Sequence, residues 1–200
     1  MKTFAKIKNA VMVGAVVAVS CVTLTACSGS GEGSEALSKY EKADLSGYEG
    51  MKDYNKEIML VDMTVDDIKK EVDKNGTFAF VASYSTCPYC NVIMPFLNDY
   101  AIQENTKVGY LDTRKNPEWK NNMEIDGYDT FLVMFGNYLR LDENEKRHLY
   151  VPHMFFIKNG KVVYNFQGVS ELLENEDSTV TDEIAEDIKL RIKEGFDELK

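Results

Sequence analysis

Apolar residues along this chain form two kinds of segment. Short, nearly continuous apolar runs predict buried strands, and they lie at residues 58–61, 78–84, 108–111, 154–157 and 162–166. Between them, apolar residues three or four positions apart predict helices after residue 64, after residue 90, over residues 128–139 and after residue 181. The predicted order is β-α-β-α-β-α-β-β-α, with no internal repeat. This alternation is typical of an α/β domain with helices packed on a central sheet.

Residues at the ends of these segments support the assignment. Thr64, with Asp67 three positions later, is a helix-start signal, and Asn75-Gly76 ends that helix. Asn159-Gly160 joins the last two apolar runs, which predicts a β-hairpin.

The region between the third and fourth apolar runs is less regular. Asn116-Pro117 is expected to open a helical region. We interpret the apolar stripe at residues 128–139 as the core-facing side of a helix, rather than as a cofactor or ligand box. A charged run follows at residues 142–147.

The N-terminus has the layout of a secretory signal. Residues 1–9 are basic, residues 10–22 are apolar, and small residues follow. The apolar run is shorter than the ~18 residues that span a bilayer comfortably. The sequence therefore predicts a signal peptide at residues 1–26.

The junction Leu24-Thr25-Ala26-Cys27 resembles the bacterial lipobox, whose cysteine receives a diacylglycerol and becomes the first residue of the mature protein. The alternative is an ordinary signal peptide in which this cysteine occurs by chance. A Ser/Gly tract at residues 28–34 has the composition of a flexible spacer. We predict lipidation at Cys27, a lipidated flexible linker at residues 27–55, and one domain at residues 56–200. That domain would be extracytoplasmic and lipid-anchored to a bacterial membrane.

Charge and cysteine usage narrow the function classes. The formal net charge is −10, and the part after the signal has 20 basic and 33 acidic side chains. A nucleic-acid partner is therefore not expected, because such binding requires a basic surface. Only two of the four cysteines, Cys87 and Cys90, lie in the predicted domain. A fold held together by disulfides would need more cysteines at wider spacing, so this pair indicates chemistry.

The pair stands in the motif Cys87-Pro88-Tyr89-Cys90, between the apolar run at residues 78–84 and a helical pattern. Two thiols at a strand-to-helix junction can form a reversible redox couple, because a helix N-terminus stabilises a thiolate on the first cysteine. Cys87 is expected to be the attacking thiol and the more exposed of the two, and Cys90 the resolving thiol. Pro88 suits the first helical turn, and Tyr89 is expected to tune the site or contact substrate.

The chain resembles the thioredoxin fold family over residues 58–200, in four features that use all four prolines. They are the Cys-Pro-Tyr-Cys pair after a central strand, Pro95 five residues after Cys90, Asn116-Pro117 after the third strand, and Val151-Pro152 before the terminal hairpin. The resemblance implies a thioredoxin fold with a central mixed sheet, a cis bond at Pro152, and substrate pairing with the backbone of Val151. Within that family, the chain looks like extracytoplasmic thioredoxin-like lipoproteins, including the bacteriocin transport accessory group.

Three features depart from that family pattern. Val81 stands where thioredoxins commonly carry a buried acid, so the proton relay to the second cysteine must differ or run through water. Thr86 replaces the usual tryptophan. Residues 121–150 are longer than in the compact pattern, and we expect a helical insertion there, before the cis-proline, that covers the site or selects partners.

Together these observations predict a membrane-anchored thiol-disulfide oxidoreductase that acts on exported proteins. It would need no cofactor and no metal, and a membrane or extracytoplasmic redox partner would reset the pair. Whether it oxidises or reduces stays open, because modest changes in thiolate stabilisation reverse the direction. One alternative is a metal module in which Cys87 and Cys90, with His148 or His153, hold copper or zinc. Another is a non-catalytic docking lipoprotein that uses residues 121–150.

Overall fold

The computed structural model describes residues 36–200, apart from residue 117 and residues 174–178. A five-stranded sheet forms the centre, in the spatial order β1-β3-β2-β6-β7. Strands β1, β3 and β2 are parallel, whereas β6 is antiparallel to β2 and β7 to β6. The strands are β1 (Leu60–Asp62), β2 (Phe78–Ser83), β3 (Val108–Asp112), β6 (His153–Lys158) and β7 (Lys161–Gln167).

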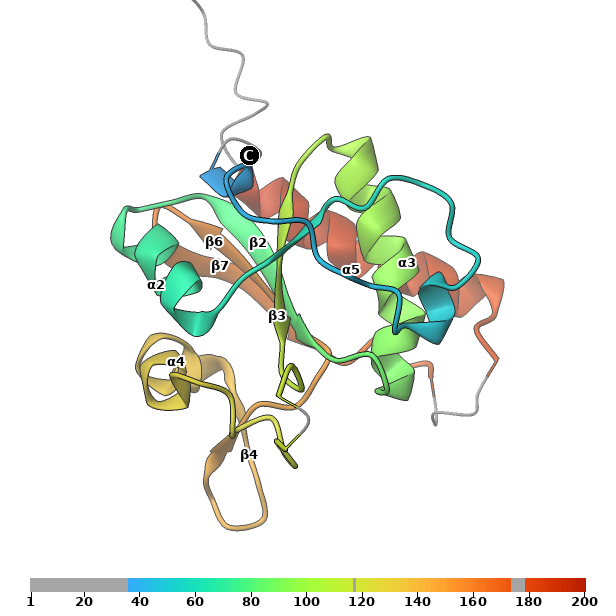
Figure 1. The fold of residues 1–200 in the computed structure, drawn as a ribbon. Coiled ribbons are helices and arrows are strands. Elements are labelled where there is room, and N and C mark those ends of the chain that lie inside the picture. Colours follow the sequence, from blue (N-terminus) through green and yellow to red (C-terminus); the bar gives the residue numbers. More distant parts are fainter. Residues whose placement is uncertain (1–35, 117, 174–178) are drawn as a thin grey trace, which may run out of the picture.

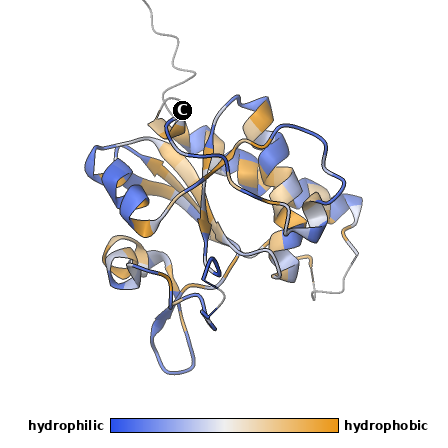
Figure 2. Ribbon diagram, in the orientation of Figure 1, coloured by the Kyte–Doolittle hydropathy of each residue, from blue (hydrophilic) through white to orange (hydrophobic). Residues whose placement is uncertain are grey.

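Helices cover both faces of this sheet (Figure 1). The helices α2 (Val65–Asp73) and α4 (Tyr128–Phe135) lie on one face, and α3 (Pro88–Gln103) and α5 (Asp182–Leu199) lie on the other. Hydrophobic residues concentrate on the sheet and on the helix sides that face it (Figure 2). The predicted fold class, a thioredoxin fold with a central mixed sheet flanked by helices, is confirmed.

Local chemistry explains most element boundaries. The Thr64 side chain accepts a hydrogen bond from the Asp67 N–H, and the Asp67 carboxylate accepts one from the Thr64 N–H, which is a capping box. The turn between β6 and β7 uses Asn159 and Gly160, both with positive φ, which suits a two-residue hairpin. All six residues of β2 are buried, as expected of a central strand covered on both faces.

The insertion at residues 121–150 contains the predicted helix, α4, although the helix makes up only part of it. After α4 the chain makes a 3-10 turn, η2 (Gly136–Tyr138), and then a small hairpin of β4 (Arg140–Leu141) and β5 (Arg147–His148). The Asp142 carboxylate forms the hairpin turn, because it accepts hydrogen bonds from the Asn144 and Lys146 N–H groups.

The helical region expected after Asn116 is wrong for the described residues 118–127, which contain turns instead. The Asn116 side-chain oxygen accepts the Glu118 N–H at 3.0 Å, and the Asn121 oxygen accepts the Met123 N–H at 2.9 Å. These Asx turns bond the backbone locally and therefore compete with a helix.

The N-terminal segment up to residue 55 is not a linker where the structure describes it. Five of its apolar residues are buried, namely Leu37, Ala43, Leu45, Tyr48 and Met51. The 3-10 turn η1 (Glu49–Met51) packs beside α3, with the Gly50 N–H donating to the Asn91 side chain at 3.0 Å. These apolar residues have neither helical nor strand spacing, so no periodic pattern identified them.

Residues 1–35 lie outside the described part of the chain, and the predicted signal peptide and Cys27 lie there with them. In the part that the structure does describe, no helix is both long enough and apolar enough to cross a membrane.

Candidate functional site

Cys87 and Cys90 lie where the carboxyl end of the central strand β2 turns into α3. Cys87 is the N-cap of α3, with extended backbone angles, and Pro88 occupies the first helical position as predicted. The Cys87 Sγ accepts a hydrogen bond from the Cys90 N–H at 3.3 Å. The first helical turn thus directs an otherwise unsatisfied N–H group at this sulfur, an arrangement that favours negative charge on it.

The two thiols differ in their surroundings, although both are in the reduced state. Cys87 is 4 % exposed and Cys90 is completely buried. Burial raises the pKa of the Cys90 thiol strongly, and its interactions with Cys87 raise that pKa further. Cys90 is therefore a protonated thiol at neutral pH that must lose a proton before it can attack a disulfide.

The loop between β5 and β6 meets the cysteines from the other side. Its Val151-Pro152 peptide bond is cis, as the resemblance implied. The Cys87 thiol lies 3.8 Å from the Val151 carbonyl oxygen, to which it donates a hydrogen bond. The Pro152 carbonyl in turn accepts the Gly168 N–H at 2.8 Å, which ties the loop to the end of β7. The structure therefore brings together all the cysteine and proline residues predicted for the site from the domain.

A hollow of about 610 Å³ lies beside the redox motif and the Val151-Pro152 loop, although neither cysteine lines it. Tyr89 from the redox motif and Val151 line it, and so do Tyr138, Arg140 and Tyr150 from the insertion. The insertion therefore forms part of the wall beside the site. Tyr89 faces this hollow, where it can contact a bound chain.

Neither His148 nor His153 lies beside the two thiols, as the alternative metal site would require. His153 lies on the face of β6 opposite to α3, where its ring stacks on Phe155 with centroids 4.2 Å apart. Its Nε2 is 3.1 Å from the Asn165 Oδ1, and burial lowers the pKa of His153 to about 4. His148 is on the small hairpin, where it packs against Tyr150. Among residues 36–200, outside the two gaps, no group of three His, Cys, Asp or Glu side chains could hold a metal ion.

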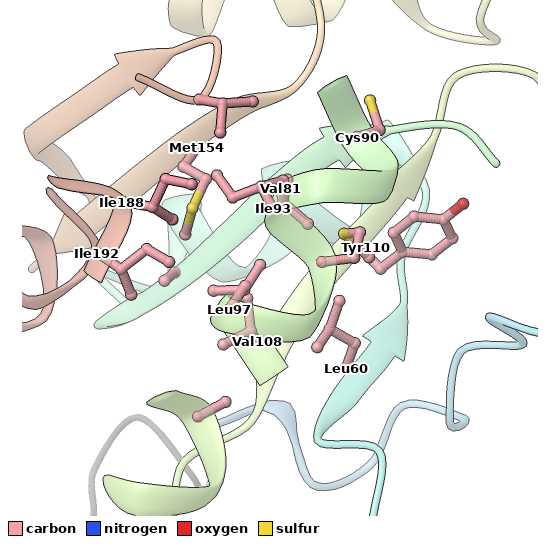
Figure 3. Close-up of a cluster of buried hydrophobic side chains, with 14 of the residues drawn as sticks. Leu60, Val81, Cys90, Ile93, Leu97, Val108, Tyr110, Met154, Ile188 and Ile192 are labelled. Carbon is pink, nitrogen blue, oxygen red and sulfur yellow. The ribbon is translucent and has the colours of Figure 1, made fainter. Parts of the chain in front are cut away.

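Three buried hydroxyl groups near Cys90 were not identified from the sequence. They belong to Ser83 at the end of β2, Tyr110 on β3 and Tyr48 before η1. Figure 3 shows Cys90 and Tyr110 on the same side of the sheet, in the cluster that α3 covers. Ser83 and Tyr110 lie in apolar runs that predicted only buried strands, and Tyr48 lies in the segment that was predicted to be a linker. The alternation of side chains along β2 was the one available signal for Ser83.

No family model matches the chain, and no curated protein matches it. Solved structures do match it. Among solved structures, thioredoxin from Trypanosoma brucei brucei is 14 % identical, with a TM-score of 0.38, covering 57 % of this chain and 83 % of its own. Thioredoxin O2 from Arabidopsis thaliana is 14 % identical, with a TM-score of 0.37, covering 56 % and 84 %. A protein described as having a thioredoxin fold is 13 % identical, with a TM-score of 0.39, covering 55 % and 83 %.

Proposed function

We propose that this protein is a thiol-disulfide oxidoreductase that acts on exported proteins from a membrane anchor outside the cytoplasm. One observation carries the proposal. Cys87 caps the N-terminus of α3 and accepts the Cys90 N–H, while Cys90 is buried one turn inside. An outer thiol that receives helix N–H groups and an inner thiol within reach of it are the two parts that disulfide exchange requires.

The reaction proceeds by two sulfur displacements. In the reducing direction, the Cys87 thiolate attacks a substrate disulfide, a mixed disulfide forms, and the first substrate sulfur leaves and takes a proton. Cys90 then loses its proton and attacks the Cys87 sulfur, which releases the second substrate thiol. Two electrons pass from the protein dithiol to the substrate, and the reverse sequence oxidises a substrate dithiol. No cofactor is required, because the sulfur pair itself carries the electrons.

The proposed substrate contacts lie beside Cys87. Val151 presents its backbone within 3.8 Å of the attacking sulfur, next to Pro152. An extended peptide can pair with such a backbone by main-chain hydrogen bonds, while its side chains enter the adjoining hollow. This arrangement suits thiol or disulfide sites in extended segments of a partner protein.

The anchoring part of the proposal rests on the sequence alone. The lipobox-like junction that ends at Cys27 and the following Ser/Gly tract support a lipid anchor with a spacer. An oxidoreductase held there would meet exported proteins and a membrane or extracytoplasmic partner that resets its redox state. Labelling with a radioactive fatty acid, in the natural chain and in Cys27→Ser, tests this part: only the natural chain is expected to take up label.

The reduction potential tests the redox part directly. Protein lacking residues 1–27 keeps Cys87 and Cys90 as its only thiols and can be equilibrated in dithiothreitol or glutathione buffers. A value near about −270 mV indicates a reductant, and one near about −120 mV indicates an oxidant. The absence of any reversible two-electron couple would contradict the proposal.

Trapping of mixed disulfides tests which cysteine attacks the substrate and which one resolves the mixed disulfide. Cys90→Ala is expected to accumulate mixed disulfides on Cys87, because the resolving thiol is missing, and Cys87→Ala is expected to accumulate none. The measurement is non-reducing electrophoresis of the purified variants after incubation with a model disulfide protein. Equal trapping by both variants would show that the roles are assigned wrongly.

A further inference from the structure

A chain of hydrogen-bonded hydroxyl groups runs under the redox pair. The Tyr48 hydroxyl is 2.7 Å from the Ser83 Oγ, and it donates to the Tyr110 hydroxyl at 3.1 Å. The three side chains are at most 3 % exposed. They come from three separate parts of the chain, since Tyr48 precedes η1, Ser83 ends β2 and Tyr110 lies within β3.

This chain begins at Cys90. Ser83 is on the same face of β2 as Val81, and that face is covered by α3, which carries Cys90. Its interaction with the Ser83 hydroxyl lowers the pKa of the Cys90 thiol, against the larger opposing effect of burial. Tyr48 and Tyr110 belong to the same buried cluster as Cys90, and Figure 3 shows Tyr110 and Cys90 within it.

Apolar packing alone would not place hydroxyls here. A buried hydroxyl costs free energy unless it is hydrogen-bonded, and an apolar side chain of similar shape avoids that requirement. Burial raises the pKa of both Tyr48 and Tyr110, so both remain neutral phenols. A neutral hydroxyl can donate one proton while it accepts another, which is what proton transfer along a chain needs.

A carboxylate stands at the far end. Asp112 lies two residues after Tyr110 on the same face of β3 and opposite Ser83 in the sheet register. It is partly exposed, and burial together with nearby Asp62 raises the pKa of its carboxyl, while its interaction with the Tyr110 hydroxyl lowers that pKa. Asp112 can therefore take up a proton from the buried chain and exchange it with solvent.

We propose that Ser83, Tyr48 and Tyr110 form a hydroxyl relay that carries the proton between Cys90 and Asp112 during disulfide exchange. The chain has Val81 in place of a buried acid that could exchange a proton with the second cysteine, and the relay would take over that exchange. This inference rests on the proposed function.

The relay balances in protons as well as electrons. As the Cys90 sulfur attacks Cys87, its proton passes to Ser83, the Ser83 proton to Tyr48, the Tyr48 proton to Tyr110, and the Tyr110 proton to Asp112. Each hydroxyl ends neutral, the Cys87–Cys90 bond forms, and the substrate thiolate leaves. In this relay Ser83 exchanges the proton with Cys90 directly, whereas Tyr48 and Tyr110 pass it on through Ser83.

A single-turnover reaction with the aromatic disulfide DTNB separates the two steps. Attack by Cys87 releases one coloured thiolate, and resolution by Cys90 releases the second. In Tyr48→Phe we expect the first release to stay within about twofold of the natural protein. The second should slow by about 10²- to 10⁴-fold, the usual contribution of proton transfer by a positioned side chain. In the natural protein, the rate of the second release should show a solvent deuterium isotope effect. The size of this isotope effect should differ in Tyr48→Phe.

Tyr54→Phe is the matched control. Tyr54 comes from the same N-terminal segment and is also hydrogen-bonded, to Asp99 at 2.5 Å and Asn98 at 2.7 Å, but it is outside the relay. Both of its release rates should match those of the natural protein. Ser83→Ala and Tyr110→Phe repeat the test where Tyr48→Phe fails to fold, as judged by circular dichroism and urea unfolding.

The outcomes separate the relay from the redox proposal. A second release unchanged within about twofold in the folded variants, or both releases slowed equally, would overturn the relay. If the natural protein released only one thiolate, the proposed redox function itself would fail. Slower resolution with intact attack supports both.

Discussion

The two faces of the central sheet differ in what they bury, although the same strands build both. On the face covered by α2 and α4, the Phe80 ring of β2 lies near four other phenylalanine rings. The ring centroids are 6.4 Å away for Phe78 and Phe131, 5.3 Å for Phe135 and 4.9 Å for Phe155. The largest side chains of this face are aromatic rings. Such packing buries a large apolar area in a fixed geometry.

The face covered by α3 and α5 carries polar groups within its core. Ser83, Tyr48 and Cys90 lie there, and the buried Asn98 side chain of α3 accepts the Met59 N–H at 2.7 Å. The Ser83, Tyr48 and Asn98 side chains are each hydrogen-bonded, which offsets the free-energy cost of burying them. Both faces bury aromatic rings, Phe156 and Phe196 among them on the side of α3 and α5, but only that side holds the thiols and the hydroxyl chain. We call the side that holds Phe80 the aromatic face, and the division between the faces is therefore one of chemistry.

The largest expected effect on stability comes from opening the aromatic face. Phe80→Ala removes a fully buried ring and should lower the free energy of unfolding by about 3–5 kcal/mol, measured by urea unfolding. The reduction potential of the folded variant should stay close to that of the natural protein, because no atom of Phe80 faces the thiols. A large shift in potential with little loss of stability would break the division between the faces.

The one histidine on the aromatic face gives a pH test of intermediate size. Because burial lowers the pKa of His153 from 6.5 to about 4, the unfolded chain binds a proton more readily than the folded one in this window. The free energy of unfolding should therefore fall by about 2 kcal/mol from this residue between about pH 7 and about pH 5.

His153→Gln removes the titration and keeps a side chain that can bond Asn165. The variant should show a shallower loss of stability over the same pH range, again measured by urea unfolding. Identical pH dependence in the two proteins would mean that His153 is not a neutral, buried part of this face.

Two helix caps, one on each face, test whether the faces unfold together. The Thr64 Oγ1 accepts the Asp67 N–H at 3.1 Å at the start of α2, and the Thr181 Oγ1 accepts the Ile184 N–H at 3.3 Å at the start of α5. Thr64→Ala and Thr181→Ala should each cost about 1 kcal/mol in one shared urea transition. A separate transition affected by only one variant would show that the faces are independent units.

Patterns of short range predicted much of the fold. The capping box at Thr64, the Asn159-Gly160 turn and the buried run of β2 depend on neighbouring residues, and the structure confirms them. The position of Cys87 and Pro88 at the start of α3 follows from the same local rules. The insertion was predicted less well, because Asx turns and a hairpin held by Asp142 leave no periodic signal.

The sequence by itself determined the redox motif, the order of the main strands and helices in the domain, and the presence of a valine rather than an acid at position 81. Only the tertiary structure decided which side chains surround Cys90. Tyr48 is about forty positions from Cys90 in the sequence, yet its hydroxyl is 2.7 Å from Ser83, because the segment expected as a linker folds back onto α3. Such a contact depends on the packing of separate segments around one core, and no local pattern of residues encodes it.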